Sequence, residues 1–243
     1  MKQAQLISYL LNRGDPSILP HYPEVNVNDP IEVKRHFPEI LRRHADDGFV
    51  IIGDCYDMYL AGDCEDYSTY LGIDVNRIVY DKVRSARQVL RVGDVGCGNP
   101  KMLKELKEEY GKDIEVVGFD LISLSHHDSL DLFVEGDFEK SLDPGLVNTF
   151  DLIFSCNTFR YLATRFSDAY SNVKRLFRTN DSLGFVNYSN YRGATRTDEL
   201  SAITSFVARN QSLVVNSSGC MRIRSDSPDN PLEYLKKHGA FDL

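Results

Sequence analysis

Apolar and polar residues alternate along the chain in blocks that predict short buried strands separated by amphipathic helices. Apolar runs of strand length occupy residues 89–95, 114–120, 132–138, 150–157 and 182–189. Between them, residues 101–110 and 166–177 carry apolar side chains at helical spacing. Strands that alternate with helices predict an α/β fold with a doubly wound, mostly parallel sheet.

The two ends of the chain show other patterns. Residues 1–88 look helical, with apolar stripes or tyrosine-rich stretches at 31–44, 56–70 and 75–88. After the last strand, the sequence predicts helices over 197–210 and 231–241, and a hairpin formed by 213–215 and 220–224. We therefore expect an N-terminal helical extension over residues 1–88, followed by a sheet domain over residues 89–243.

The first strand of the sheet ends in a glycine-rich turn that leads into a helix. The turn reads Asp94-Val95-Gly96-Cys97-Gly98, with Asn99 as the expected helix cap and Pro100 in the first turn. The helix is expected to stop at Gly111. Because glycine has no side chain, a ligand can approach the backbone closely at Gly96 and Gly98.

Acidic residues end the next two strands. Asp120 lies 24 residues after Gly96, near the offset of roughly 20 residues at which nucleotide-binding βαβ units place a ribose-binding carboxylate. The third strand ends in Glu135-Gly136-Asp137-Phe138, and the fourth reads Phe150-Asp151-Leu152-Ile153-Phe154-Ser155-Cys156-Asn157. The pattern predicts a nucleoside-binding site at the carboxyl ends of these strands.

These four motifs, in this order and at this spacing, resemble those of the class I S-adenosylmethionine-dependent methyltransferases. The resemblance covers residues 85–190. It implies a Rossmann-like, doubly wound, mostly parallel seven-stranded sheet, with the predicted hairpin as its antiparallel edge. It also implies S-adenosylmethionine as the cofactor, bound by residues 89–243, and a substrate-shaping cap formed by residues 1–88.

The resemblance assigns a role to each matching residue. The backbone around Gly96 and Gly98 would cradle the methionine part of the cofactor, and Asp94 would orient that loop or the ammonium group. Asp120 would accept hydrogen bonds from both ribose hydroxyls, a task that suits an acceptor-only carboxylate. Asp137 would bind the adenine amino group, Phe138 the adenine face, and Ser155 would line the side towards the substrate. The full implied cofactor-binding set is Asp94, Gly96, Cys97, Gly98, Asp120, Leu121, Asp137, Phe138 and Ser155.

The implied reaction is transfer of a methyl group from a sulfonium to an acceptor. Because the sulfonium is already an activated leaving group, alignment of the reactants can supply much of the rate. Arg160 and Tyr161, in the loop after the fourth strand, are the candidate catalytic residues and would orient the acceptor. The Asn/Asp-Pro-Pro-aromatic motif of nucleobase amino methyltransferases is missing at Ser155-Cys156-Asn157-Thr158, which favours a small-molecule acceptor.

Two other classes of protein compete with this interpretation. A nicotinamide-dependent dehydrogenase is disfavoured because Lys101 stands where its fingerprint has a third small residue, and because Asp94 precedes the first glycine. A methyltransferase-like binding or scaffold subunit without catalysis is favoured by the short link from Leu121 to Leu130. This link leaves room for a loop or a single turn in place of the family's helix. Its His126-His127-Asp128 predicts a solvated loop, since adjacent residues rarely converge on one metal ion.

Composition limits the partners and the compartment. The net charge of −8 argues against general nucleic-acid binding. Residues 158–224 are rich in arginine; most of these side chains fit a solvated helix face, whereas Arg160 and Arg192 follow strand ends and favour an acceptor with anionic groups. Five cysteines without metal-site spacing predict a reduced, cytoplasmic protein in which Cys97 and Cys156 are small buried side chains. No apolar run reaches the roughly 20 residues of a membrane span, and the first apolar run is too short for a secretion signal.

Overall fold

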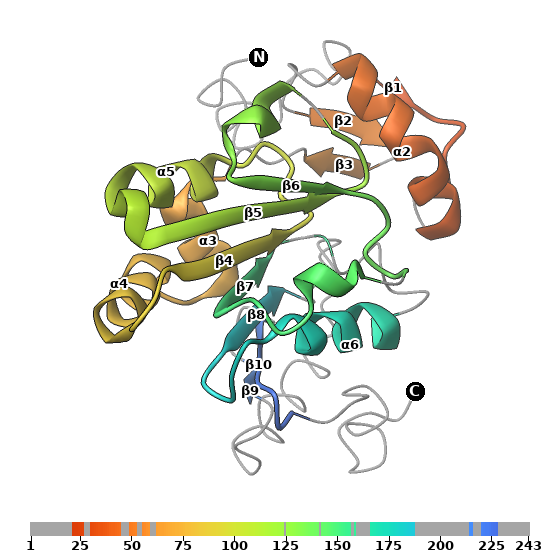
Figure 1. Cartoon of the computed structure of the whole chain (residues 1–243). Helices are drawn as coiled ribbons and strands as arrows, with labels where there is room; N and C mark the ends of the chain where they lie inside the picture. The colour runs from red at the N-terminus through yellow and green to blue at the C-terminus, as the bar shows by residue number, and fades with distance from the viewer. Residues whose placement is uncertain are drawn as a thin grey trace.

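The main element of the chain is a seven-stranded sheet (Figure 1) with the order β6-β5-β4-β7-β8-β10-β9. The computed structural model describes residues 21–26, 30–44, 49–52, 55–58, 62–123, 125–140, 142–156, 158, 166–187, 214–215 and 220–227. The strands are β4 (Leu90–Val95), β5 (Ile114–Asp120), β6 (Leu132–Glu135), β7 (Leu152–Ser155), β8 (Leu183–Asn187), β9 (Val214–Val215) and β10 (Cys220–Ile223). The predicted α/β sheet is therefore confirmed, including its hairpin.

The direction of the strands locates the expected binding crevice. Strands β6, β5, β4, β7 and β8 pair in parallel, while β10 runs antiparallel to both β8 and β9. The chain order reverses between β4 and β7, and open α/β sheets bind ligands at the carboxyl ends of the strands at such a reversal. The antiparallel β10 next to β8 also separates this sheet from the all-parallel order of dinucleotide-binding folds.

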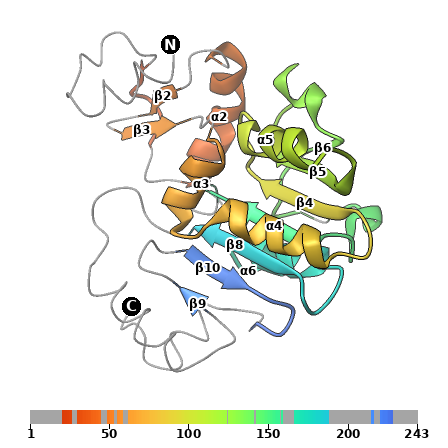
Figure 2. The ribbon, with the colours of Figure 1, turned by 90° about the vertical axis from the view of Figure 1, so that its left-hand side faces the viewer.

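Helices cover both faces of the sheet (Figures 1 and 2). Helices α3 (Cys64–Leu71), α4 (Val75–Ser85) and α5 (Lys101–Tyr110) lie on one face, and α6 (Phe166–Leu176) lies on the other. Side chains of β7 alternate between the two cores: Leu152 and Phe154 pack with α3 and α5, and Ile153 packs with α6. Continuous apolar strand sequences are thus explained by burial on both faces.

The region before the sheet contains more than the predicted helices. Helix α2 (Pro30–His44) forms as expected, but β1 (His21–Tyr22), β2 (Phe49–Ile52) and β3 (Cys55–Met58) make a separate small sheet. The helix expected over residues 56–70 is therefore wrong in its first part, and helical structure begins only at Cys64. The β2 sequence Phe-Val-Ile-Ile is aromatic and β-branched, which favours a strand, and β3 is its antiparallel partner.

Helices α3 and α4 belong to the helical layer of the sheet, although they precede it in the chain. Their buried residues share one core cluster with β4, α5 and β5. The boundary at residue 88 between an extension and a sheet domain stays a prediction.

Short elements test the remaining local predictions. Helix α5 ends at Gly111, whose φ of 55° is left-handed, as predicted. Its N-cap is Pro100 and makes no side-chain hydrogen bond, so the expected cap at Asn99 is wrong. Among the described residues of the short link between β5 and β6, the regular structure is the 3₁₀ turn η3 (Ser125–Ser129), in agreement with the predicted single turn or loop. Further 3₁₀ turns are η2 (Gly111–Asp113) and η4 (Pro144–Leu146).

Several predictions lie outside the described residues. They are the helices over 197–210 and 231–241 and the candidate catalytic residues Arg160 and Tyr161. Within the described part of the chain, every helix falls short of the length and apolar character needed to cross a bilayer.

Candidate functional site

The glycine-rich turn after β4 has a backbone that only glycine adopts without strain. Gly96 and Gly98 have positive φ angles of 73° and 50°. The amides of Gly96 and Cys97 both donate to the carbonyl of Phe119, at 2.7 and 3.1 Å, which fixes the turn against β5. A Cβ atom added at Gly96 would lie 1.9 Å from Oγ1 of Thr158. Thr158, in the segment that follows β7, therefore packs directly against the backbone of the turn at Gly96.

Asp120, at the end of β5, joins the glycine-rich turn to the neighbouring strand. Its Oδ2 accepts from the amide of Gly98 at 2.8 Å, and its Oδ1 accepts from the amide of Leu121 at 2.7 Å. Burial raises the pKa of this carboxyl, and the two backbone hydrogen bonds oppose that shift. Each carboxylate oxygen has two lone pairs, so both keep acceptor capacity for a ligand hydroxyl.

Asp94, at the end of β4, is a buried carboxylate with one oxygen unpaired. Its Oδ2 accepts from the hydroxyl of Tyr67 at 2.6 Å, while no described residue donates to its buried Oδ1. The pKa of Asp94 is raised to about 7, chiefly by burial; the Tyr67 hydrogen bond opposes this shift, and the charge of Asp120 contributes to it. A buried acceptor without a partner is costly, so this oxygen marks a place where a ligand group fits.

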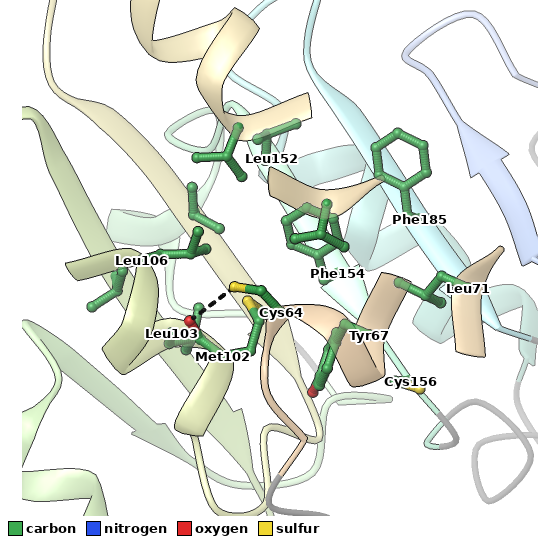
Figure 3. Close-up of a cluster of buried hydrophobic side chains, with 14 of the residues drawn as sticks. Cys64, Tyr67, Leu71, Met102, Leu103, Leu106, Leu152, Phe154, Cys156 and Phe185 are labelled. Carbon is green, nitrogen blue, oxygen red and sulfur yellow. Dashed lines mark hydrogen bonds between the residues drawn. The ribbon is translucent and has the colours of Figure 1, made fainter. Parts of the chain in front are cut away.

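Helix α3, which carries Tyr67, is anchored to the start of α5. Asp63 caps α3 and accepts from Nζ of Lys101 at 2.6 Å. The amide of Cys64 donates to Oε2 of Glu105 at 3.0 Å, and its thiol donates to the carbonyl of Met102 at 3.8 Å (Figure 3). Figure 3 also shows the Tyr67 ring within this apolar cluster. Helix α5, which follows the glycine-rich turn, thus holds α3 in place and with it the Tyr67 hydroxyl.

His127, in the short link, supports the glycine-rich turn from the other side. It is buried, and its Nε2 lies 2.7 Å from the carbonyl of Gly98. Because a carbonyl only accepts, Nε2 must carry the proton. The ring stacks on Phe133 with centroids 3.9 Å apart. The expected solvated loop is therefore wrong at His127, whose ring is held by these two contacts, although Asp128 is exposed.

Asp137 and Phe138 follow β6 at the adenine end of the predicted site. Oδ1 of Asp137 pairs with Nζ of Lys34 at 2.7 Å, and the same ammonium lies 2.5 Å from Oε2 of the buried Glu139. Burial acts to raise the pKa of Asp137, but the Lys34 hydrogen bond and charge outweigh it and the net shift is downward. Phe138 packs edge-to-face on Phe119, with 8% of its surface exposed. Most of the Phe138 ring is thus committed to the core.

Ser155 ends β7 beside the glycine-rich turn. Its hydroxyl is buried and donates to the carbonyl of Val95 at 2.8 Å, which ties β7 to the end of β4. Cys97 and Cys156 are buried free thiols, as predicted, and the Cys97 thiol lies 3.9 Å from Nε2 of His127.

The structure brings most of the predicted cofactor residues to one edge of the sheet. Asp94, the glycine-rich turn, Asp120 and Leu121 lie at the adjoining ends of β4 and β5, with Ser155 at the end of β7 and Asp137 after β6. Sequence reasoning missed Tyr67, His127 and Lys34 as parts of this region. Tyr67 was one of several tyrosines in its segment, and no local pattern marked its hydroxyl as the partner of Asp94.

A groove of about 650 Å³ lies at the opposite end of the sheet. Leu90 and Leu183, the first residues of β4 and β8, both line it, together with residues of the turn before β8. The groove therefore has no part in the carboxyl-edge site.

Comparison with known proteins gives a match over the strands that form the carboxyl-edge site. Residues 93–184 match a family model described as a methyltransferase domain. A comparison with curated proteins gives no match. Among solved structures, the CMeT domain of the citrinin polyketide synthase is 16% identical with a TM-score of 0.44, and the match covers 66% of this chain and 53% of that one.

Two further solved structures are similar over part of the chain. CalS10, an amino pentose methyltransferase from Micromonospora echinaspora, is 22% identical with a TM-score of 0.39, over 49% of this chain and 52% of that one. KedS8, a sugar N-methyltransferase from Streptoalloteichus sp., is 18% identical with a TM-score of 0.39, over 54% and 51%. The chain spans about half the length of these three solved structures.

The matched segment begins within β4, ends within β8 and contains the glycine-rich turn and both strand-end carboxylates. The mostly parallel sheet with an antiparallel hairpin at its edge agrees with the architecture that the resemblance implies. Residues 93–184 are thus similar to a methyltransferase domain, and this is the segment whose motifs resemble those of the S-adenosylmethionine-dependent methyltransferases.

Proposed function

We propose that this protein binds S-adenosylmethionine at the carboxyl edge of β4 and β5 and transfers its methyl group to a small-molecule acceptor with anionic groups. One observation supports this proposal above the others. The glycine-rich turn lies between two strand-end carboxylates, and one of them, Asp94, has a buried oxygen without a partner among the described residues. Such a pair suits a ligand that is cationic at one end and carries hydroxyls at the other.

The residues present fit the cofactor on three counts. Gly98 has no side chain and a φ of 50°, so the methionine part can approach the backbone closely there. The unpaired Oδ1 of Asp94 suits the ammonium group of that part, directly or through water. Asp120 already accepts from two amides and is thereby oriented for the ribose hydroxyls.

The proposed contacts to the adenine are less favourable than those to the methionine part and the ribose. Asp137 would accept from the adenine amino group while sharing Lys34, and Leu121 would pack against the base. Phe138 offers only the small exposed part of its ring. The hydroxyl of Ser155 is engaged by Val95, so Ser155 would shape the pocket and not act as a free donor.

The bound cofactor would supply an already activated methyl group. The chain's own part would be to hold the cofactor and the acceptor in line and to exclude water, since alignment alone can account for much of the acceleration. Arg160 and Tyr161 remain our proposed groups for orienting the acceptor, and the arginines of residues 158–224 motivate an anionic one. A cytoplasmic location likewise remains a proposal from the cysteine pattern.

Calorimetric titration with S-adenosylhomocysteine, the demethylated product, tests the proposal directly. We expect one-to-one binding with a Kd on the order of micromolar or tighter. A folded protein that binds none would contradict the proposal and favour the alternative, a methyltransferase-like subunit that serves as a scaffold or needs a partner. Binding without methyl transfer to any small carboxylate, phosphate or sugar in a radiolabelled-methyl assay would favour the same alternative.

A further inference from the structure

Asp94 and Asp120 place two carboxylates at adjacent ends of β4 and β5 without a cation on Asp94. No lysine or arginine in the described part of the chain pairs with Asp94. A buried carboxylate that lacks a counter-ion is strongly disfavoured unless it takes up a proton or meets a cation. The neighbouring charge of Asp120 adds to this cost. The geometry therefore makes Asp94 a group whose charge depends on what occupies the site.

Tyr67 is the residue that can keep Asp94 charged. Its ring is buried in the α3 and α5 cluster, and its hydroxyl lies 2.6 Å from Oδ2 of Asp94, the length of a strong hydrogen bond to an anion. Burial and the nearby acid raise the pKa of Tyr67 well above its usual range, so the hydroxyl stays a donor at every working pH. The other oxygen of Asp94 is left for the ligand.

We propose that Asp94 must release a proton to solvent for the cofactor's ammonium group to bind, and that Tyr67 is the positioning residue that stabilises the resulting carboxylate. This inference rests on the proposed function, because it concerns the same cofactor site. It makes cofactor affinity depend on pH through one buried acid on β4. It also gives α3, a helix outside the family's matched segment, a defined task in cofactor binding.

Three other titratable groups face Asp94: Cys97, Cys156 and Asp120. Cys97 in the glycine-rich turn and Cys156 after β7 are thiols whose pKa values burial raises, so both stay neutral around neutral pH. Asp120 is the remaining titratable neighbour. Tyr67 makes no hydrogen bond to it, so a substitution at Tyr67 acts on the titration of Asp94 and leaves the two amide bonds of Asp120 in place.

The expected pH dependence follows from the pKa of Asp94, which burial raises to about 7. Below that pKa the site is mostly protonated, so affinity rises with pH until Asp94 is charged and then levels off. Between about pH 5.5 and about pH 7.5, the affinity for S-adenosylhomocysteine should rise roughly twentyfold. Near pH 6, binding should release about one proton for each S-adenosylhomocysteine molecule bound.

Titration calorimetry of the full chain with S-adenosylhomocysteine measures both quantities. The affinity is followed across this pH range, and the released protons are counted by repeating the titration near pH 6 in buffers of different ionisation enthalpy. Tyr67→Phe should bind more weakly at neutral pH and shift the midpoint upward. Tyr110→Phe is the matched control, because Tyr110 is a half-buried tyrosine packed on the same cluster at the far end of α5. It should behave as the wild type.

Each outcome separates this inference from the proposed function. Tight binding that is independent of pH and releases no proton overturns the inference and leaves the proposed function standing. A Tyr67→Phe protein with the wild-type midpoint overturns the role of Tyr67. If Tyr67→Phe does not fold, as judged by circular dichroism, Asp94→Asn provides the second test, since its binding should be weak and independent of pH. Absence of binding at every pH by the folded wild type contradicts the proposed function itself.

Discussion

Replacing Asp120 with alanine removes the carboxylate that links the glycine-rich turn to the end of β5. A hydrogen bond to a charged group contributes roughly 1.5–3 kcal/mol, so two ribose hydroxyls on Asp120 would contribute about 3–6 kcal/mol. Since about 1.4 kcal/mol corresponds to a factor of ten, we expect the Kd for S-adenosylhomocysteine to rise by at least about a hundredfold. Loss of the acceptor for the amides of Gly98 and Leu121 adds to this effect by loosening the turn.

Asp131→Ala is a matched control for this substitution. Asp131 also accepts a backbone amide, that of Val116 at 2.8 Å, and pairs with Lys107 at 2.8 Å, but it precedes β6 at the opposite end of the sheet. Both variants should lose stability in urea unfolding, and only Asp120→Ala should lose affinity in calorimetry. An Asp120→Ala protein that is folded and binds as tightly as the wild type would refute the ribose role. Equal loss of affinity in both variants would show that the effect is one of general stability.

Two further substitutions test the framework around the site. Gly96→Ala should destabilise the fold by more than about 2 kcal/mol, because its φ is 73° and a Cβ would lie 1.9 Å from Thr158. Gly111→Ala, with positive φ but no atom within 4 Å of the added Cβ, should cost only about 1 kcal/mol, and equal midpoints in urea would contradict the packing argument. Lys34→Met should lower stability at neutral pH and flatten its pH dependence in acid. The pKa of Asp137 is lowered in the folded protein, so the stability that this carboxylate contributes is full above its unfolded pKa of 3.8 and is lost as the pH falls further. The measurement compares urea midpoints near neutral pH and at about pH 3. If the midpoints of the wild type and of Lys34→Met change in parallel between these pH values, this expectation is contradicted.

The sheet could be predicted from sequence because its central strands, β4, β5 and β7, are buried on both faces. Strand β5 reads Ile-Glu-Val-Val-Gly-Phe-Asp, and a short, mostly apolar run of this kind between a helix end and an acid is typical of a buried parallel strand. The glycines and strand-end acids of the site were recognisable for a similar reason, since each follows a strand at a regular spacing. Strands β2 and β3 are an antiparallel pair separated by Gly53-Asp54, a two-residue hairpin signal that the helical interpretation of this region overlooked. Strand β1 has only two residues and pairs with β2 from far along the chain, so no local pattern marks it.

The supporting contacts of the site were beyond sequence reasoning because they join residues far apart in the chain. Tyr67 and Asp94 are separated by 27 positions, and Lys34 and Glu139 by 105. The burial of His127 depends on its stacking partner Phe133 and on the Gly98 carbonyl, which only the folded sheet brings together. Local structure set by neighbouring residues, such as the glycine-rich turn after β4, was predictable, whereas contacts made by tertiary packing were not.

The missing helix between β5 and β6 has a consequence for how the protein opens locally. β6 is an edge strand of four residues, none of them fully buried, and Leu132 is 37% exposed, while the core strands beside it are closed on both faces. Strands with few apolar contacts unfold locally at low free energy. The amides of β6 should therefore exchange with solvent hydrogen sooner than those of β4 and β5. Because Asp137 follows β6, a cofactor that engages it would slow this exchange, and part of its binding free energy would be consumed in ordering the strand.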